Sequence, residues 1–200
     1  MMVIKKIKAV LYKLVLAPYY RFYFAGFGSN SKILRPTGID GPKRIFIGNQ
    51  VLISWYSWLA ANPLTGNDQC RLIIGDGTYI GRFAHIYATS KIEIGKKVLI
   101  ADKVYISDNL HGHQNINLPV IDQPIVQARE VMIGDGAWLG ENVCIVGASV
   151  GKNAVIGANA VVTRDIPDHC IAVGIPAQII KRYNFERNEW QKTNDAGEFI

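Results

Sequence analysis

Aliphatic residues recur at every sixth position through most of the chain, and glycine or another small or polar residue follows most of them. A period of six differs from the helical period of about 3.6 residues and is more regular than a meander of hairpins. Each unit therefore predicts a short strand and a bend, with one aliphatic side chain directed inward. The register shifts once, by one residue, after Ile145, and its positions are Ile47, Ile53, Ile74, Ile80, Ile86, Ile94, Ile100, Ile106, Ile133, Leu139, Ile145, Val150, Ile156 and Val162.

Repetition of such units predicts an all-β solenoid, in the form of a parallel β-helix whose coils stack on one another. The alternative is a sandwich with unusually even strands. That fold would use hairpin turn pairs such as Asn-Gly, which are absent between the units. The pattern therefore favours the β-helix.

Two segments interrupt the register, residues 55–71 and residues 109–130. Interruptions of a solenoid are the usual places for binding loops. The second has 22 residues, which exceeds the usual loop length of about 12 to 15 residues, so function or disorder must explain it. It contains two of the four histidines, His111 and His113.

The N-terminus has the pattern of an amphipathic helix, with aliphatic residues at helical spacing and lysines between them. Lys13 and Arg21 interrupt every apolar run long enough to span a membrane, and Lys13 also interrupts a secretory signal. Two interpretations stay open. Residues 1–24 either lie on an anionic membrane surface or pack on the body or on a neighbouring subunit.

Charge is concentrated at this end of the chain. Residues 1–44 hold nine Lys and Arg against one acid, a net +8, whereas the remaining residues hold thirteen against fifteen, a net −2. A nearly neutral body lacks the basic stripe of a nucleic-acid-binding protein, so no nucleic-acid partner is expected. The three cysteines have no CxxC spacing, which predicts neither a disulfide framework nor a thiolate zinc site and favours a reducing compartment.

Three stretches, residues 133–145, 151–167 and 174–177, resemble the hexapeptide-repeat acyltransferases, the superfamily of galactoside, maltose and serine acetyltransferases. The features that carry the resemblance are Trp138, the segment Ile-Gly-Ala-x-x-Val-Val-Thr and the closing Gly-x-Pro-Ala. Within the superfamily, the histidine loop and the tail look most like the sugar O-acetyltransferases of capsule, O-antigen and exopolysaccharide biosynthesis.

The resemblance implies a left-handed β-helix over residues 45–182, with the extended loop at 109–130. A basic N-terminal amphipathic helix and lead-in over 1–44 and a short C-terminal helix or tail over 183–200 would flank it. It also implies a homotrimer with active sites between subunits, acetyl-CoA as the acyl donor and no metal. The expected reaction transfers an acetyl group to a sugar hydroxyl in the cytoplasm. If residues 1–24 bind the cytoplasmic face of a membrane, a lipid-linked saccharide becomes the expected acceptor.

Acyl transfer to a hydroxyl requires a base, and histidine suits that role at neutral pH. His111 matches the family position of the base and is preferred to His113, because Asp108-x-x-His111 resembles the arrangement in polysaccharide acetyltransferases. Asp108 either orients the imidazole or caps a turn, and the sequence leaves both open.

The resemblance also places coenzyme A contacts. Glu141 replaces a small polar residue of galactoside acetyltransferase and Gln178 replaces an arginine, so these two positions depart from the family. The expected coenzyme A-binding residues are Trp138, Gly140, Glu141, Ala158, Thr163, Arg164, Gln178 and Lys181.

Acceptor recognition is assigned to Trp55 and Trp58 in the first interruption, because aromatic faces stack on sugar rings; packing against a neighbour is the alternative. Three other functions remain open. They are N-acetylation of an aminosugar, a noncatalytic β-helical scaffold, and a zinc enzyme that would use His85, His111 and His113.

Overall fold

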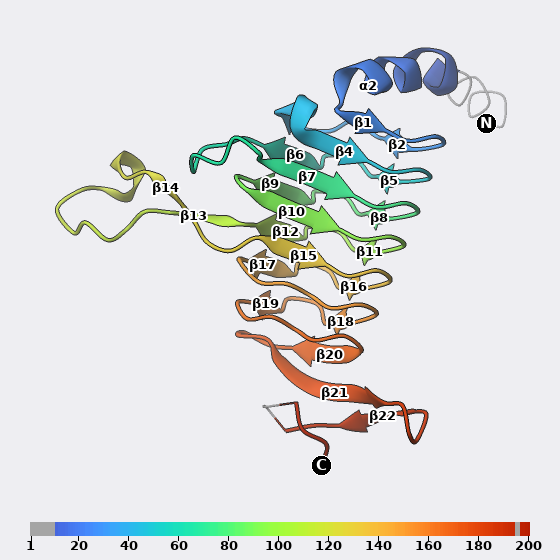
Figure 1. The fold of residues 1–200 in the computed structure, drawn as a ribbon, viewed down its shortest axis with the longest axis vertical. Coiled ribbons are helices and arrows are strands. Elements are labelled where there is room, and N and C mark those ends of the chain that lie inside the picture. Colours follow the sequence, from blue (N-terminus) through green and yellow to red (C-terminus); the bar gives the residue numbers. More distant parts are fainter. Residues whose placement is uncertain (1–10, 195–196) are drawn as a thin grey trace.

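The computed structural model describes residues 11–194 and 197–200, which form a parallel β-helix with three sheets around one core (Figure 1). Sheet A contains β1 (Gly26–Phe27), β4 (Ile45–Ile47), β7 (Arg71–Ile74), β10 (Lys91–Ile94) and β15 (Val131–Ile133). Sheet B contains β2 (Lys32–Ile33), β5 (Leu52–Ile53), β8 (Tyr79–Ile80), β11 (Leu99–Ile100), β16 (Trp138–Leu139), β18 (Val155–Ile156), β20 (Cys170–Val173), β21 (Gln178–Asn184) and β22 (Glu189–Lys192). Sheet C contains β3 (Gly38–Asp40), β6 (Trp58–Ala61), β9 (His85–Ala88), β12 (Tyr105–Ser107), β17 (Cys144–Val146) and β19 (Val161–Val162).

The predicted aliphatic register forms the core. In sheet C, Ile86 pairs with Ile106 and Ile106 with Ile145, and equivalent columns run through the other two sheets. These three side chains have no exposed surface. Aliphatic side chains at equivalent positions of successive coils stack on one another and are buried without hairpin connections, as the period of six predicted.

The first coil begins earlier than residue 45. Strands β1, β2 and β3 pair in parallel with β4, β5 and β6 of the next coil. The sequence held the signal, since Phe27, Ile33 and Ile39 are also spaced by six. Likewise Leu59 lies six residues after Ile53 and is fully buried on β6, so the first interruption is limited to residues 62–70.

The one-residue shift after Ile145 leaves the stack intact. Val150 forms parallel bridges to Ile133 in the coil before and to Ile166 in the coil after. Gly147 absorbs the shift with a φ of +56°, a left-handed conformation that glycine adopts without strain.

A short helical segment covers the N-terminal end of the β-helix. It comprises the π-helix η1 (Tyr12–Leu16) and α2 (Ala17–Tyr23), while the earlier part of the expected helix lies outside the described residues. Tyr20 and Phe24 are buried beneath it, and the Tyr12 hydroxyl accepts a hydrogen bond of 2.8 Å from the Ile33 N–H. The opposite face of this segment is exposed to solvent, and Phe22 on it is 79% exposed. No helix in the described part of the chain has the length and apolar character needed to cross a membrane.

The C-terminal residues, for which a helix or a tail was expected, form a β-hairpin. β21 pairs antiparallel with β20 and β22 pairs antiparallel with β21 (Figure 1). The hairpin occupies the strand edge that the last coil would leave unpaired in sheet B, which explains why the chain continues as strand rather than helix.

Candidate active site

The second interruption contains an antiparallel hairpin, β13 (Asn109–His111) and β14 (Ile125–Gln127), which projects from the β-helix between β12 and β15 (Figure 1). His111 lies at its outer end and pairs with Ile125. The short 3-10 helix η3 (Val120–Asp122) lies in the loop beyond. The hairpin therefore carries both candidate bases away from the core.

Both loop histidines are exposed, but their rings are held differently. The Nδ1 atom of His113 lies 3.2 Å from the backbone carbonyl oxygen of His111. A carbonyl oxygen can only accept a hydrogen bond, so this contact assigns the proton to Nδ1 and leaves Nε2 of a neutral His113 free to take a proton. In the described part of the chain the ring of His111 has no such partner.

Asp108 has no exposed surface, and its carboxylate accepts hydrogen bonds from the coil before it. Its Oδ1 receives the backbone N–H of Thr89 at 2.8 Å, and its Oδ2 receives those of Ser90 and Lys91, each at 2.8 Å. The structure contains no hydrogen bond between Asp108 and either loop histidine among the described residues. This geometry favours the turn-capping interpretation, in which Asp108 fixes the base of the hairpin.

The two interruptions of the register meet at Gln127, a contact that sequence reasoning missed. The side-chain oxygen of Gln127 accepts hydrogen bonds from the Thr65 hydroxyl at 2.7 Å and from the Thr89 hydroxyl at 3.1 Å. Its amide nitrogen donates to the Asp108 carbonyl oxygen at 2.6 Å. Nothing in the six-residue pattern marks these positions, because they lie where the pattern stops.

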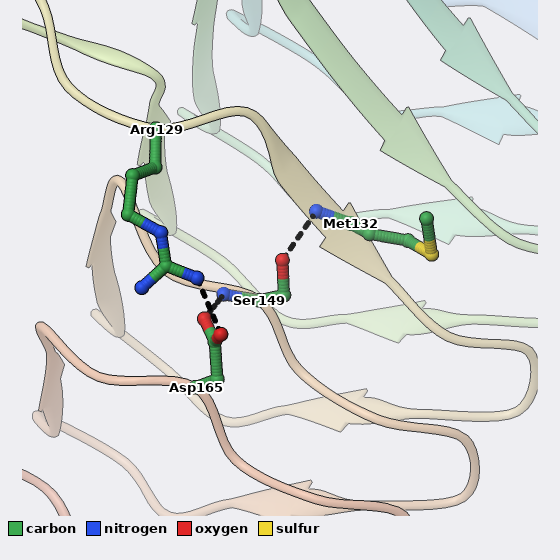
Figure 2. A network of polar contacts seen from close by, with 4 residues as sticks. All are labelled: Arg129, Met132, Ser149 and Asp165. Atoms are coloured by element: carbon green, nitrogen blue, oxygen red, sulfur yellow. Dashed lines mark hydrogen bonds and ion pairs between the residues drawn. The ribbon is translucent and has the colours of Figure 1, made fainter.

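A polar network anchors the returning end of the hairpin to later coils (Figure 2). Arg129 forms an ion pair with Asp165, whose Oδ1 also accepts the Ser149 N–H at 2.8 Å. The Ser149 hydroxyl accepts the Met132 N–H at 3.0 Å. The Ser149 hydrogen bond, and secondarily Arg129, lowers the pKa of Asp165, so its carboxylate stays charged beside Arg129.

The expected coenzyme A residues divide between places on the surface. Gly140, Glu141 and Ala158 lie on the edge of the prism where sheet B turns into sheet C, whereas Thr163 and Arg164 follow β19 on the edge beyond sheet C. Trp138 faces outward from β16 and is 48% exposed. Gln178 and Lys181 lie on β21 of the C-terminal hairpin. One chain therefore does not bring all of these residues to the histidine hairpin.

Trp55 and Trp58 lie at different places. Trp58, on β6, stacks on the His85 ring at a centroid distance of 4.4 Å, and its Nε1 donates to the Asp40 carboxylate at 2.5 Å. Trp55 lies on the edge between sheets B and C, beneath the guanidinium of Arg82 at 5.0 Å. The two tryptophans do not form a single sugar-stacking surface within one chain.

His85 lies on β9, away from the loop histidines. Its Nε2 atom is buried without a hydrogen-bond partner among the described residues, and burial lowers the pKa of the ring. Over residues 11–194 and 197–200 no group of three or more His, Cys, Asp or Glu side chains is placed to hold a metal ion.

Comparison with known sequences relates the repeats to a described family. The family model named "Hexapeptide repeat of succinyl-transferase" matches residues 130–164. The putative lipopolysaccharide biosynthesis O-acetyl transferase WbbJ of Escherichia coli is 36% identical over 129 residues, which are 60% of this chain and 65% of WbbJ. The chain therefore carries hexapeptide repeats and is similar to the hexapeptide-repeat acyltransferases.

Further relatives in the superfamily are acetyltransferases by name. A probable acetyltransferase of Mycobacterium tuberculosis is 42% identical over 55% of this chain and 37% of its own length. Galactoside O-acetyltransferase of Lactococcus lactis is 40% identical over 36% of this chain and 37% of its own length. The chain thus spans less than two thirds of the length of each of these curated relatives.

Solved structures share the left-handed β-helix. AntD, an N-acyltransferase from Bacillus cereus, has a TM-score of 0.67 and 20% identity over 85% of this chain and 90% of AntD. A hexapeptide-repeat acetyltransferase from Vibrio cholerae has a TM-score of 0.59 and 24% identity over 84% of this chain and 78% of its own. At these identities the similarity establishes the fold.

Proposed function

We propose that the protein is an acetyl-CoA-dependent O-acetyltransferase that acetylates a sugar hydroxyl in capsule, O-antigen or exopolysaccharide biosynthesis. The observation that carries the proposal is the histidine-bearing hairpin, the longest departure from a β-helix that is otherwise regular. A scaffold would have no need of two exposed imidazoles carried at the outer end of an anchored hairpin. The names of WbbJ and of the galactoside O-acetyltransferases support a sugar hydroxyl as the acceptor.

In this mechanism the imidazole of His111, with His113 as the alternative base, accepts the proton of the acceptor hydroxyl. The hydroxyl oxygen attacks the thioester carbonyl carbon, and the carbon–sulfur bond then breaks. The imidazolium returns its proton to the departing thiolate, so the products are the acetyl ester and coenzyme A with a free thiol. Asp108 does not contact the reacting groups in this mechanism; it positions the hairpin by fixing its first residues.

Donor binding is assigned to the later coils. Arg164 and Lys181 supply positive charge for the phosphates, and the exposed Trp138 supplies an apolar wall for the pantetheine arm. Glu141 and Gln178 fit phosphate binding less well, because one is acidic and the other neutral. The site is therefore expected to rely on Arg164 and Lys181 for charge.

A homotrimer completes the proposed site. The hairpin loop exposes large apolar side chains, with Ile116 93% and Ile121 86% exposed, which is costly in water and is expected of a surface covered by another copy. A hairpin that reaches across to a neighbour brings its histidines to that neighbour's coenzyme A residues. The acceptor is a sugar or lipid-linked saccharide, handled in the cytoplasm or on the cytoplasmic face of the membrane.

The test is calorimetric titration of acetyl-CoA into the wild type, His111→Ala and His113→Ala, with thiol release measured against a panel of sugars, nucleotide sugars and amino sugars. If His111 is the base, His111→Ala binds acetyl-CoA normally but loses roughly 10²- to 10⁴-fold in rate. His113→Ala then retains most activity.

Three other results decide against parts of the proposal. Loss of turnover in His113→Ala alone would transfer the role of base to His113. Turnover only with amino sugars would replace O-acetylation by N-acetylation. Absence of acetyl-CoA binding in the wild type would leave a noncatalytic scaffold.

A further inference from the structure

The edge between sheets B and C carries a left-handed residue in each of six successive coils. Each coil is joined to the next there; for example, the Phe83 N–H donates to the Trp55 carbonyl oxygen at 3.1 Å and the Lys103 N–H to that of Arg82 at 2.7 Å. The same edge carries Glu141 and Ala158. The left-handed residues are Arg35, Tyr56, Phe83, Lys103, Asn142 and Asn159.

A groove of about 300 Å³ lies at the N-terminal end of this edge, lined by Arg35, Trp55, Tyr56, Arg82 and Phe83. Two arginines and three aromatic rings make up the whole lining. The combination offers positive charge together with flat apolar walls.

Both arginines are available to an anion. Neither Arg35 nor Arg82 forms an ion pair with a carboxylate among the described residues. The nearest acid in the edge, Asp102, accepts a hydrogen bond from the backbone N–H of Arg82 at 2.7 Å rather than from its guanidinium. The Trp55 ring lies 5.0 Å below that guanidinium and holds it by a cation–π contact, which leaves the N–H donors of Arg82 free.

The aromatic walls occupy positions that are unfavourable for them. Tyr56 and Phe83 stack at a centroid distance of 5.2 Å and have φ angles of +64° and +57°. Asn142 and Asn159 stand at the equivalent turns of later coils, and asparagine adopts this conformation more easily than a bulky ring does. Backbone strain of this kind persists where the side chain serves a purpose. The rings remain 45% and 53% exposed, as a ligand-binding wall requires.

We infer that this groove binds the diphosphate of the acceptor, whose sugar is attached through that diphosphate to a nucleoside or to a lipid. Arginine binds phosphate oxygens through paired N–H donors, and the rings pack against the group that the diphosphate carries. Glu141 lies two to four coils further along the same edge, roughly 10 to 20 Å at the usual strand spacing. The inference rests on the proposed function, because it assigns the acceptor of that reaction.

The experiment titrates the full-length protein with three probes: inorganic pyrophosphate, uridine diphosphate and geranyl diphosphate. Variants Arg35→Gln, Arg82→Gln and Trp55→Leu alter the groove, and Arg71→Gln, an exposed arginine on β7 in sheet A, is the matched control. We expect each groove arginine variant to weaken diphosphate binding roughly tenfold or more, and Arg71→Gln to leave it unchanged. Tighter binding of uridine diphosphate indicates a nucleotide-linked acceptor, and tighter binding of geranyl diphosphate a lipid-linked one.

Several results overturn the inference while the proposed function stands. These are acetyl transfer to a sugar without any diphosphate binding, or diphosphate binding that neither arginine variant weakens. A change in oligomeric mass in the groove variants, without diphosphate binding in the wild type, would assign the groove to a subunit interface. Acetyl-CoA binding is measured on the same samples, and its absence overturns the proposed function instead.

Discussion

Asp108 is the most heavily hydrogen-bonded side chain near the hairpin, and its partners explain its position. The carboxylate accepts three backbone N–H groups of residues 89–91, the Thr89 hydroxyl at 3.0 Å and the Asn109 side-chain amide at 3.1 Å. No solvent reaches it. A buried carboxylate of this kind stabilises the fold only while every oxygen is paired.

We therefore predict that Asp108→Asn lowers the free energy of unfolding by about 1 to 3 kcal/mol, because one amide NH2 group then faces backbone N–H donors. Urea denaturation measures the change, and Asp122→Asn, an exposed acid in the same interruption, serves as the control. Full stability combined with lost turnover would instead show that Asp108 orients a catalytic imidazole.

His85 makes stability depend on pH. Burial lowers the pKa of its ring in the folded protein below the ordinary value of 6.5. Protonation is then easier in the unfolded chain, so the contribution of His85 to stability is complete above pH 6.5 and declines as the pH falls through that value towards the folded pKa.

We predict that the melting temperature of the wild type falls on acidification below about pH 6.5, and that His85→Phe reduces this fall by keeping the stack on Trp58 without a titrating group. Melting curves at several pH values test this. A variant with the same pH dependence as the wild type would show that other groups cause the fall.

At the scale of elements, the histidine hairpin differs from every other element in the described chain by projecting from the prism (Figure 1). Hydrogen bonds hold its base, from the Asp108 carboxylate and Gln127 on one side and from Arg129 and Asp165 on the other. Beyond that base its apolar residues contact little, so the tip contributes little to the fold of one chain. We therefore expect the tip to contact another subunit.

Shortening the hairpin tests this. The Gly112 N–H already donates to the Pro124 carbonyl oxygen at 2.9 Å, so an Asn-Gly turn can replace residues 113–123. We expect an unchanged circular dichroism spectrum and a smaller oligomer by light scattering. An unchanged molecular mass would show that the tip is not part of a subunit interface.

At the scale of the whole molecule, charge and apolar exposure coincide at the N-terminal end. Residues 1–44 carry a net charge of +8, and the helix that covers this end leaves Leu14 69% and Phe22 79% exposed. Anionic lipid attracts such a surface, and the attraction weakens as salt rises.

We predict that the protein sediments with vesicles containing phosphatidylglycerol and much less with phosphatidylcholine alone, and that salt reverses the binding. Phe22→Ser weakens it, whereas Phe185→Ser at the opposite end, where the ring is 69% exposed, does not. Equal sedimentation of Phe22→Ser and wild type would favour contact of the helix with protein.

The solenoid was predictable from the sequence because its rule is local. Each coil repeats the same aliphatic position, so the spacing of Ile80, Ile100 and Leu139 predicts that they stack, and these residues do pair in adjacent strands. The boundaries of the β-helix were harder to predict. The first coil and β6 were missed although Phe27, Ile33, Ile39 and Leu59 keep the spacing, and the C-terminal hairpin forms because an open sheet edge requires a partner.

By itself, then, the sequence determined the β-helix, the similarity to hexapeptide-repeat acyltransferases and the segment that carries the candidate bases, since each depends on residues close together in the chain. Only the tertiary structure decided which surfaces those residues share. It buried Asp108 under residues 89–91, separated Trp55 from Trp58, and aligned Arg35 and Arg82 in one groove. Contacts form between residues in adjacent coils. The number of residues that separate two adjacent coils in the sequence depends on the length of the irregular loops, so the sequence period alone does not identify these contacts.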